Sequence, residues 1–207
     1  MHTAFIVAAV VAALVNWSTR VKPNRSLENI SKPLTTLMVI GIAVTSGASA
    51  GQVAVAAVAL TLCLIGDIAL LSSIDKFVIG LASFLLGHLA FIVLFVMYGL
   101  HSTTLAGIAI ILASLLVITI GRVIVAGATQ ADPALRTPVL AYLAIISAMG
   151  TVGWATGRWW VVAGSALFVG SDAVLGWGRF VRDKRWMSLV VMVTYHAAIA
   201  SLALSLR

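Results

Sequence analysis

The sequence predicts an all-α membrane protein, a bundle of about eight transmembrane helices with both termini outside the cytoplasm. Of its 207 residues, 62% are hydrophobic and only 9% are charged, and the mean hydropathy is +1.14. A soluble domain of this length cannot bury so much apolar surface. The apolar residues form runs long enough to cross a bilayer, and most basic residues lie between the runs. We therefore expect a single transmembrane domain over residues 1–207.

Eight apolar runs separated by polar or turn-forming residues define the expected helices. They cover residues 3–19, 33–49, 51–71, 77–98, 103–125, 137–155, 159–177 and 186–206. The first run has no basic segment before it, which favours a membrane span over a signal peptide. The second run is short, and the SGASAG that follows its apolar residues is a tight turn or an irregular helix end.

Prolines and tryptophans fit these boundaries. A proline at a helix start is harmless, because its missing N–H would have no partner there. The prolines all fall in expected connections or at expected helix starts: Pro23, Pro33, Pro133 and Pro138. Tryptophan prefers the membrane interface, where its ring can be apolar on one side and hydrated on the other. The tryptophans all fall at expected span ends: Trp17, Trp154, Trp159, Trp160, Trp177 and Trp186.

The basic residues set the orientation. One set of alternate loops and adjoining span ends holds Arg20, Lys22, Arg25, Lys32, Lys76, Arg122, Arg136, Arg179, Arg182, Lys184 and Arg185. The opposite side holds only Arg158 and Arg207. Lys and Arg accumulate on the cytoplasmic side, so both termini are expected outside. The net charge of +7 then reflects topology signals and lipid headgroups rather than nucleic acid. We expect a multi-pass protein of the cell's inner (plasma) membrane, and nothing indicates its oligomeric state.

Two aspartates interrupt apolar runs, Asp67 in LIGDIALL and Asp172 in LFVGSDAVLG. A charge at membrane depth costs several kcal/mol unless it is paired. Both spans run from outside to inside, and at ~1.5 Å per residue Asp67 lies roughly 7 Å and Asp172 roughly 10 Å from the cytoplasmic end. The other four acids lie in expected loops. We therefore expect the two aspartates to face each other across one lipid-accessible cavity.

Other polar side chains are expected in the same half of the membrane or near its midplane: Asn16, Lys32, His88, Tyr142, Ser171, Tyr195 and His196. Each also has a structural interpretation. The aspartates can pin neighbouring helices, His88 can bond a hydroxyl, and the tyrosines can be packing residues. Ser171 can bond its own helix backbone. Tyr195 and His196 point to different helix faces, so at most one of them faces a shared cavity.

The spacing of the histidine and cysteine residues gives little support to a metal site. No two of the four histidines lie four residues apart on one helix, and Cys63 is the only cysteine. A site formed by His88, His196, Asp67 and Asp172 is geometrically conceivable, but the pattern does not require it. We expect neither a metal nor another cofactor.

Several motifs together resemble the YhhN family, the lysoplasmalogenases. They are SKPLTT (31–36), GDIALL (66–71), FVIGLASFLLGHLAFI (77–92), PVLAYLAIISAM (138–149), GSALFVGSDAVLGWGRF (164–180) and VTYHAA (193–198). The resemblance implies an eight-span hydrolase that cleaves the vinyl-ether bond of lysoplasmalogens (alkenylglycerophospholipids) to a fatty aldehyde and a glycerophospho-base. Its implied catalytic pair is Asp67 and Asp172. Its implied substrate-binding residues are Lys32, His88, Tyr142, Ser171 and Tyr195.

The sequence departs from the family pattern at two positions. Ile199 stands where the family often has a glutamine, and His196 stands where a second aromatic residue is usual. Both lie in the last expected span. If the glutamine binds the headgroup, these positions bear on which lipid is accepted.

The chemistry of a vinyl ether suits two carboxyl groups. One must donate a proton to carbon, and the other must stabilise the resulting cation and accept a proton from water, as in glycoside hydrolysis. The expected partners are a lysophospholipid substrate and membrane lipids. Two alternatives remain: a small proton-coupled transporter, which would also use buried Asp and His, and a non-catalytic lipid-binding protein.

Overall fold

The computed structural model describes residues 1–207. Its helices are α1 (His2–Val21), α2 (Arg25–Val44), α3 (Ala50–Ala69), α4 (Phe77–Tyr98), α5 (Thr103–Leu116), η1 (Val117–Gly121), α6 (Arg122–Ala131), η2 (Pro133–Leu135), α7 (Arg136–Ala155), α8 (Trp159–Phe180) and α9 (Arg185–Leu204). The π-helical turn η1 joins α5 and α6 into one span, Thr103–Ala131, and eight helices in all are long and apolar enough to cross a membrane. The predicted fold class is confirmed.

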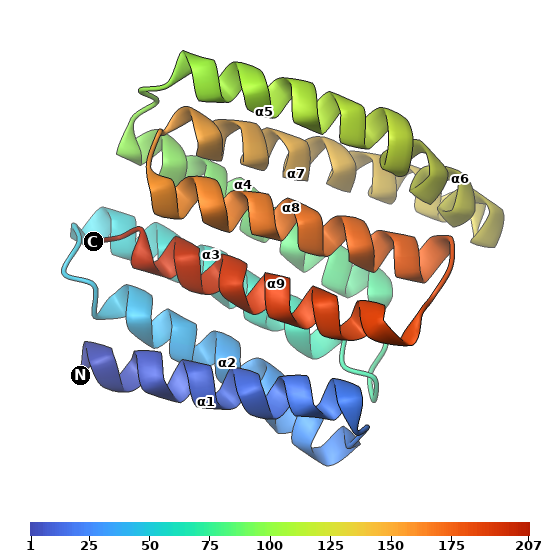
Figure 1. Ribbon diagram of the computed structural model, residues 1–207, viewed down its shortest axis with the longest axis horizontal. Helices are drawn as coiled ribbons and strands as arrows, with labels where there is room; N and C mark the ends of the chain where they lie inside the picture. Colours follow the sequence, from blue (N-terminus) through green and yellow to red (C-terminus); the bar gives the residue numbers. More distant parts are fainter.

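The long helices lie side by side in one bundle (Figure 1). Neighbours in sequence pack together from α1 to α4, and α4 then packs against α7. The C-terminal helix α9 lies between α8 and the α1–α2 pair, and it is the most buried of the eight spans. The α5 helix packs against α7 at the edge of the bundle. Polar residues on α2, α3, α4, α7, α8 and α9 can therefore meet in the interior.

Close helix approach depends on glycine at two positions. A Cβ atom added to Gly164 of α8 would lie 2.7 Å from the Leu202 side chain and 3.1 Å from the Ala198 carbonyl oxygen of α9. A Cβ atom added to Gly127 of α6 would overlap the carbonyl group of Phe180 at the end of α8. Small residues permit such packing between membrane helices, where no hydrophobic effect drives the helices together.

The second helix begins eight residues earlier than predicted, at Arg25 instead of residue 33, and ends at Val44. The Asn24 side chain caps it by accepting a hydrogen bond from the Leu27 N–H at 3.1 Å. Pro33 therefore lies inside the helix, and its predicted place at a helix start is wrong. The first two turns bury Glu28, Ser31 and Lys32 in the bundle. This tertiary packing outweighs the loss of one backbone hydrogen bond at the proline.

The fifth span also differs from its prediction, because it continues six residues beyond 125 and contains the π-helical turn. Within α5 only Ala109 is buried, and within η1 only Gly121. The other side chains of α5 are mostly apolar and exposed, as expected of a helix that faces lipid. This span is thus the least enclosed wall of the bundle.

Both termini lie at the same end of the molecule (Figure 1). At this end the Arg158 side chain donates a hydrogen bond to the Arg207 carbonyl oxygen at 3.2 Å. The distribution of basic residues predicts that this end is outside. In a Cys63→Ala background, Asp183→Cys should react with an impermeant maleimide only from the cytoplasmic side, and His101→Cys only from outside. The reverse labelling pattern would show that the orientation is wrong.

Candidate active site

The two intramembrane aspartates line the same polar cavity, which has a volume of about 260 Å³. Asp67 comes from α3 and Asp172 from α8, the two helices that were expected to run in the same direction. Asp67 is almost fully buried, whereas the Asp172 side chain is 11% exposed. Lys32, Ser171 and Tyr195 also line this cavity, so the fold brings together five of the residues singled out in the sequence.

Asp67 is held by two hydroxyl donors and one cation from α2 and α9. Its Oδ2 atom accepts hydrogen bonds from the Thr36 hydroxyl at 2.5 Å and from the Tyr195 hydroxyl at 2.8 Å. The Lys32 Nζ atom lies 3.7 Å from Oδ1, and both side chains are at least 95% buried. Lys32 and Thr36 are four residues apart and so lie on one face of α2. A cation and two hydroxyl donors together stabilise Asp67 as a carboxylate.

Asp172 has different partners. The Tyr142 hydroxyl of α7 donates a hydrogen bond to its Oδ2 atom, and the His88 Nε2 atom of α4 lies 3.4 Å from the same oxygen. His88 Nε2 also lies 3.0 Å from the Tyr142 oxygen. Because the single phenolic proton is directed at Asp172, His88 must be the donor in its bond to Tyr142. Both contacts engage Oδ2, which leaves Oδ1 without a side-chain partner.

The His88 ring is fixed by aromatic packing. It is completely buried, and its centroid lies 4.6 Å from that of Phe168 with the planes at 81°. Phe168 and Phe84 both pack edge-on against Tyr195, at 5.5 and 5.7 Å. These aromatic contacts connect the surroundings of the two aspartates. Edge-to-face packing of this kind restricts the ring orientations and so positions the polar atoms that the rings carry.

Ser171 bonds a neighbouring helix instead of its own. Its hydroxyl donates to the Val191 carbonyl oxygen of α9 at 3.1 Å. Ser171 lines the polar cavity beside Asp172, but its only proton is used in this bond between α8 and α9. The expected bond to its own helix is therefore wrong. A residue predicted to bind substrate is here also a contact between two helices.

His196 lies apart from both aspartates. Its Nδ1 atom accepts a hydrogen bond from the Trp17 indole N–H at 3.0 Å, and the two rings stack. Tyr195 faces the cavity while His196 faces α1, as their positions on different helix faces predicted. The conceivable metal set of His88, His196, Asp67 and Asp172 is not assembled, because no three His, Cys, Asp or Glu side chains are grouped as metal ligands.

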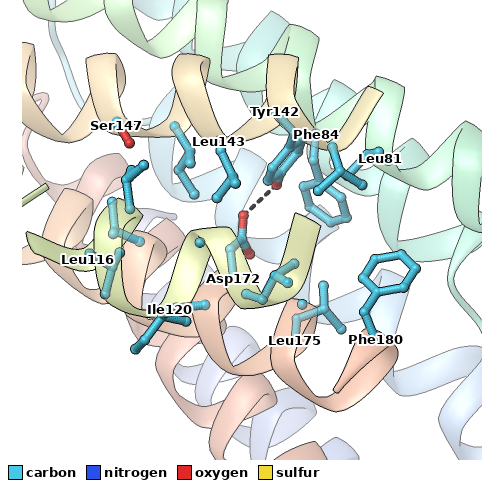
Figure 2. A pocket seen from close by; sticks show the side chains of 18 of the residues that line it. Leu81, Phe84, Leu116, Ile120, Tyr142, Leu143, Ser147, Asp172, Leu175 and Phe180 are labelled. Carbon is cyan, nitrogen blue, oxygen red and sulfur yellow. Dashed lines mark hydrogen bonds between the residues drawn. The ribbon is translucent and has the colours of Figure 1, made fainter. Parts of the chain in front are cut away.

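An apolar cavity lies on the other side of Asp172 (Figure 2). It is enclosed by α4, the η1 turn and its flanking residues, α7 and α8, and has a volume of about 60 Å³. Leu70, Phe84, Asp172 and Leu175 line both this cavity and the polar one. In Figure 2 the Asp172–Tyr142 pair lies at the centre of the apolar side chains. Asp172 thus lies at the boundary between a polar and an apolar compartment.

Some residues of the site were not assigned a role from the sequence. Thr36 forms part of the SKPLTT motif, and its spacing of four residues from Lys32 could have placed it beside Asp67. Arg20 and Arg179 line the polar cavity at the end of the bundle that was predicted to be cytoplasmic. Arg20 pairs with Glu28 at 3.0 Å, and Arg179 pairs with the exposed Asp75 at 3.2 Å. Both arginines at this end of the cavity are thus paired with carboxylates.

Fold and site together define a multi-pass membrane protein with two differently held carboxyl groups on one polar cavity, one of which also borders an apolar cavity. The YhhN family profile matches residues 27–206, and the chain belongs to the YhhN family. It is 33% identical over 155 residues to the lysoplasmalogenase TMEM86B of Rattus norvegicus, an alignment that covers 71% of this chain and 59% of that protein. The chain thus spans about three fifths of its relative's length. No solved structure matches it significantly.

Proposed function

We propose that this protein is a membrane-embedded hydrolase that cleaves the vinyl-ether bond of lysoplasmalogens. The products are a fatty aldehyde and a glycerophospho-base. The observation that carries the proposal is the placement of Asp67 and Asp172, with different hydrogen-bond partners, on one cavity that borders an apolar compartment. The name of the rat relative supports the same substrate class.

In the proposed reaction, Asp172 is the general acid. Its Oδ2 atom is held by Tyr142 and His88, whereas Oδ1 is free of side-chain partners and can carry a proton towards the substrate. Asp172 has no lysine or arginine partner and contacts only the His88 ring at 3.4 Å, whereas Asp67 has Lys32 at 3.7 Å. Two carboxyl groups in such different surroundings can take different roles, one as acid and one as base. The partner sets thus favour Asp172 as the acid and Asp67 as the carboxylate.

The proposed steps add up to hydrolysis of the vinyl ether by one water molecule. The Asp172 proton adds to the β-carbon of the O–CH=CH unit, which leaves an oxocarbenium ion stabilised by the Asp67 carboxylate. Water adds to the cationic carbon as a carboxylate takes its proton, and the hemiacetal then collapses. The C–O bond breaks on the aldehyde side, and the glycerol oxygen leaves with a proton. Acid–base catalysis of this kind contributes about 10²–10⁴-fold.

The test uses two matched lipids. Purified protein in detergent is incubated with a lysoplasmalogen and, separately, with the ester lysolipid of the same chain and headgroup. We expect free aldehyde from the vinyl ether and no fatty acid from the ester, because an ester offers no basic β-carbon to protonate. Release of fatty acid without aldehyde would make the protein an esterase and refute the proposal.

A further inference from the structure

A groove on the lipid-facing surface lies beside the apolar cavity. The groove lies between α5 and α7, has a volume of about 380 Å³ and is lined by residues of these two helices and of η1. Val117 and Ser147 line both the cavity and the groove. The two spaces are therefore adjacent at these side chains. In Figure 2, Ser147 and Leu116 lie on one side of Asp172 and Phe180 on the other.

The enclosed part of this path is too small for a whole fatty chain. Its volume is about 60 Å³, well below the ~300 Å³ or more of a typical ligand pocket. The path along α7 from Tyr142 to Thr151 rises over nine residues, or about 14 Å. This is close to the depth of one leaflet, half of a hydrocarbon core ~30 Å thick. The hydrocarbon chain of a lipid could therefore start at Asp172, pass Ser147 and end in the bilayer.

The polar cavity extends the other way from Asp172, towards Arg179 and Asp183 at the end of α8 and the loop beyond it. A lipid placed along both spaces would keep its headgroup near the membrane surface and its chain near the midplane. The outer wall of the chain path is α5 with η1, the least enclosed span of the bundle. A π-helical turn inside an α-helix frequently marks a functional site.

We infer that the seam between α5 and α7, passing Val117 and Ser147, holds the hydrocarbon chain of the lipid substrate, whose end lies in the bilayer. The inference rests on the proposed function for the identity of the substrate. The hydrocarbon chain of the substrate is thereby assigned to one of several grooves on the protein surface. The groove between α1 and α2, lined by residues such as Val7 and Leu34, shares no residue with either cavity at Asp172.

The first test places a bulky side chain in the path. Ser147→Phe narrows the junction, and Ser114→Phe narrows the groove from the exposed side of α5. The matched control is Ala141→Phe, on the exposed face of α7 outside both spaces. We expect both path variants to lower kcat/KM about tenfold or more for a sixteen-carbon alkenyl chain. A substrate with a four-carbon chain ends before Ser147, so the path variants should cleave it with the same kcat/KM as the unchanged protein. Equal loss for both chains, or no loss from either variant, would overturn the inference.

The second test does not need turnover. A lysophospholipid with a photoreactive diazirine at the end of its chain is cross-linked to the unchanged protein in detergent, and adducts are located by mass spectrometry. Adducts within 110–118 and 147–151 support the path, and adducts confined to α1 and α2 overturn it. If the protein releases no aldehyde from any lysoplasmalogen, the proposed function fails, and this labelling alone decides the path.

Discussion

Asp172→Asn should lower the rate of aldehyde release by a factor of about a hundred or more, since it removes the proton that the reaction requires. The amide keeps the size of the side chain and can still accept the hydrogen bond from Tyr142. No lysine or arginine pairs with Asp172, so the change leaves neither of these cations without a partner. We therefore expect a folded protein with normal thermal stability and almost no turnover.

Asp67→Asn should cause a similar loss of activity, and the double variant should be hardly worse than the worse single one, because the two groups act as a unit. Asp132→Asn is the matched control: it makes the same chemical change at an exposed position outside both cavities. We expect its turnover to stay near that of the unchanged protein. If Asp67→Asn and Asp172→Asn both fold and both release aldehyde at near-normal rates, the aspartates are structural and the mechanism is wrong.

Lys32→Met should destabilise the folded protein by about 3–5 kcal/mol, because it leaves the Asp67 carboxylate buried without its cation. Both side chains are at least 95% buried, so the remaining carboxylate is poorly solvated. Thermal unfolding in detergent, followed by circular dichroism, measures the effect. Lys76→Met, in an exposed position at the start of α4, is the control and should leave the unfolding temperature nearly unchanged.

The double variant Lys32→Met/Asp67→Asn separates the ion pair from packing. It removes both charges, so most of the stability lost in Lys32→Met should return, although activity should not. A double variant as unstable as Lys32→Met would show that Lys32 contributes through its packing or through other partners. In that case Asp67 would not depend on Lys32 for its charge.

The position of the two aspartates inside the membrane spans can be predicted from the sequence for a physical reason. A charged residue inside an apolar run can be recognised without knowing how the helices pack. Asp67 and Asp172 were expected at similar depth, and the structure places both on one cavity. Their hydrogen-bond partners are harder to predict. Thr36 is an ordinary hydroxyl in a helix, and only the packing of α2 against α3 gives it a role.

The helix boundaries and the proposed path of the substrate's hydrocarbon chain depend still more on how the helices pack. Pro33 suggested a helix start, but the buried polar residues before it extend α2 to Arg25. The apolar cavity is lined by leucine, isoleucine, valine and phenylalanine, the residues that fill every span of this sequence. Nothing in their pattern distinguishes those around a cavity from those around a filled core. The π-helical turn at Val117–Gly121 likewise contains no proline or glycine pair that would predict it from the sequence.

The most direct test of the central claim is hydrolysis of a lysoplasmalogen in deuterated water. If Asp172 protonates the β-carbon, a solvent deuteron becomes attached to the carbon next to the aldehyde group. Trapping the aldehyde as a hydrazone as it forms, followed by mass spectrometry, should show one deuterium at that carbon. An aldehyde without deuterium at that carbon would contradict protonation at carbon and, with it, the role assigned to Asp172.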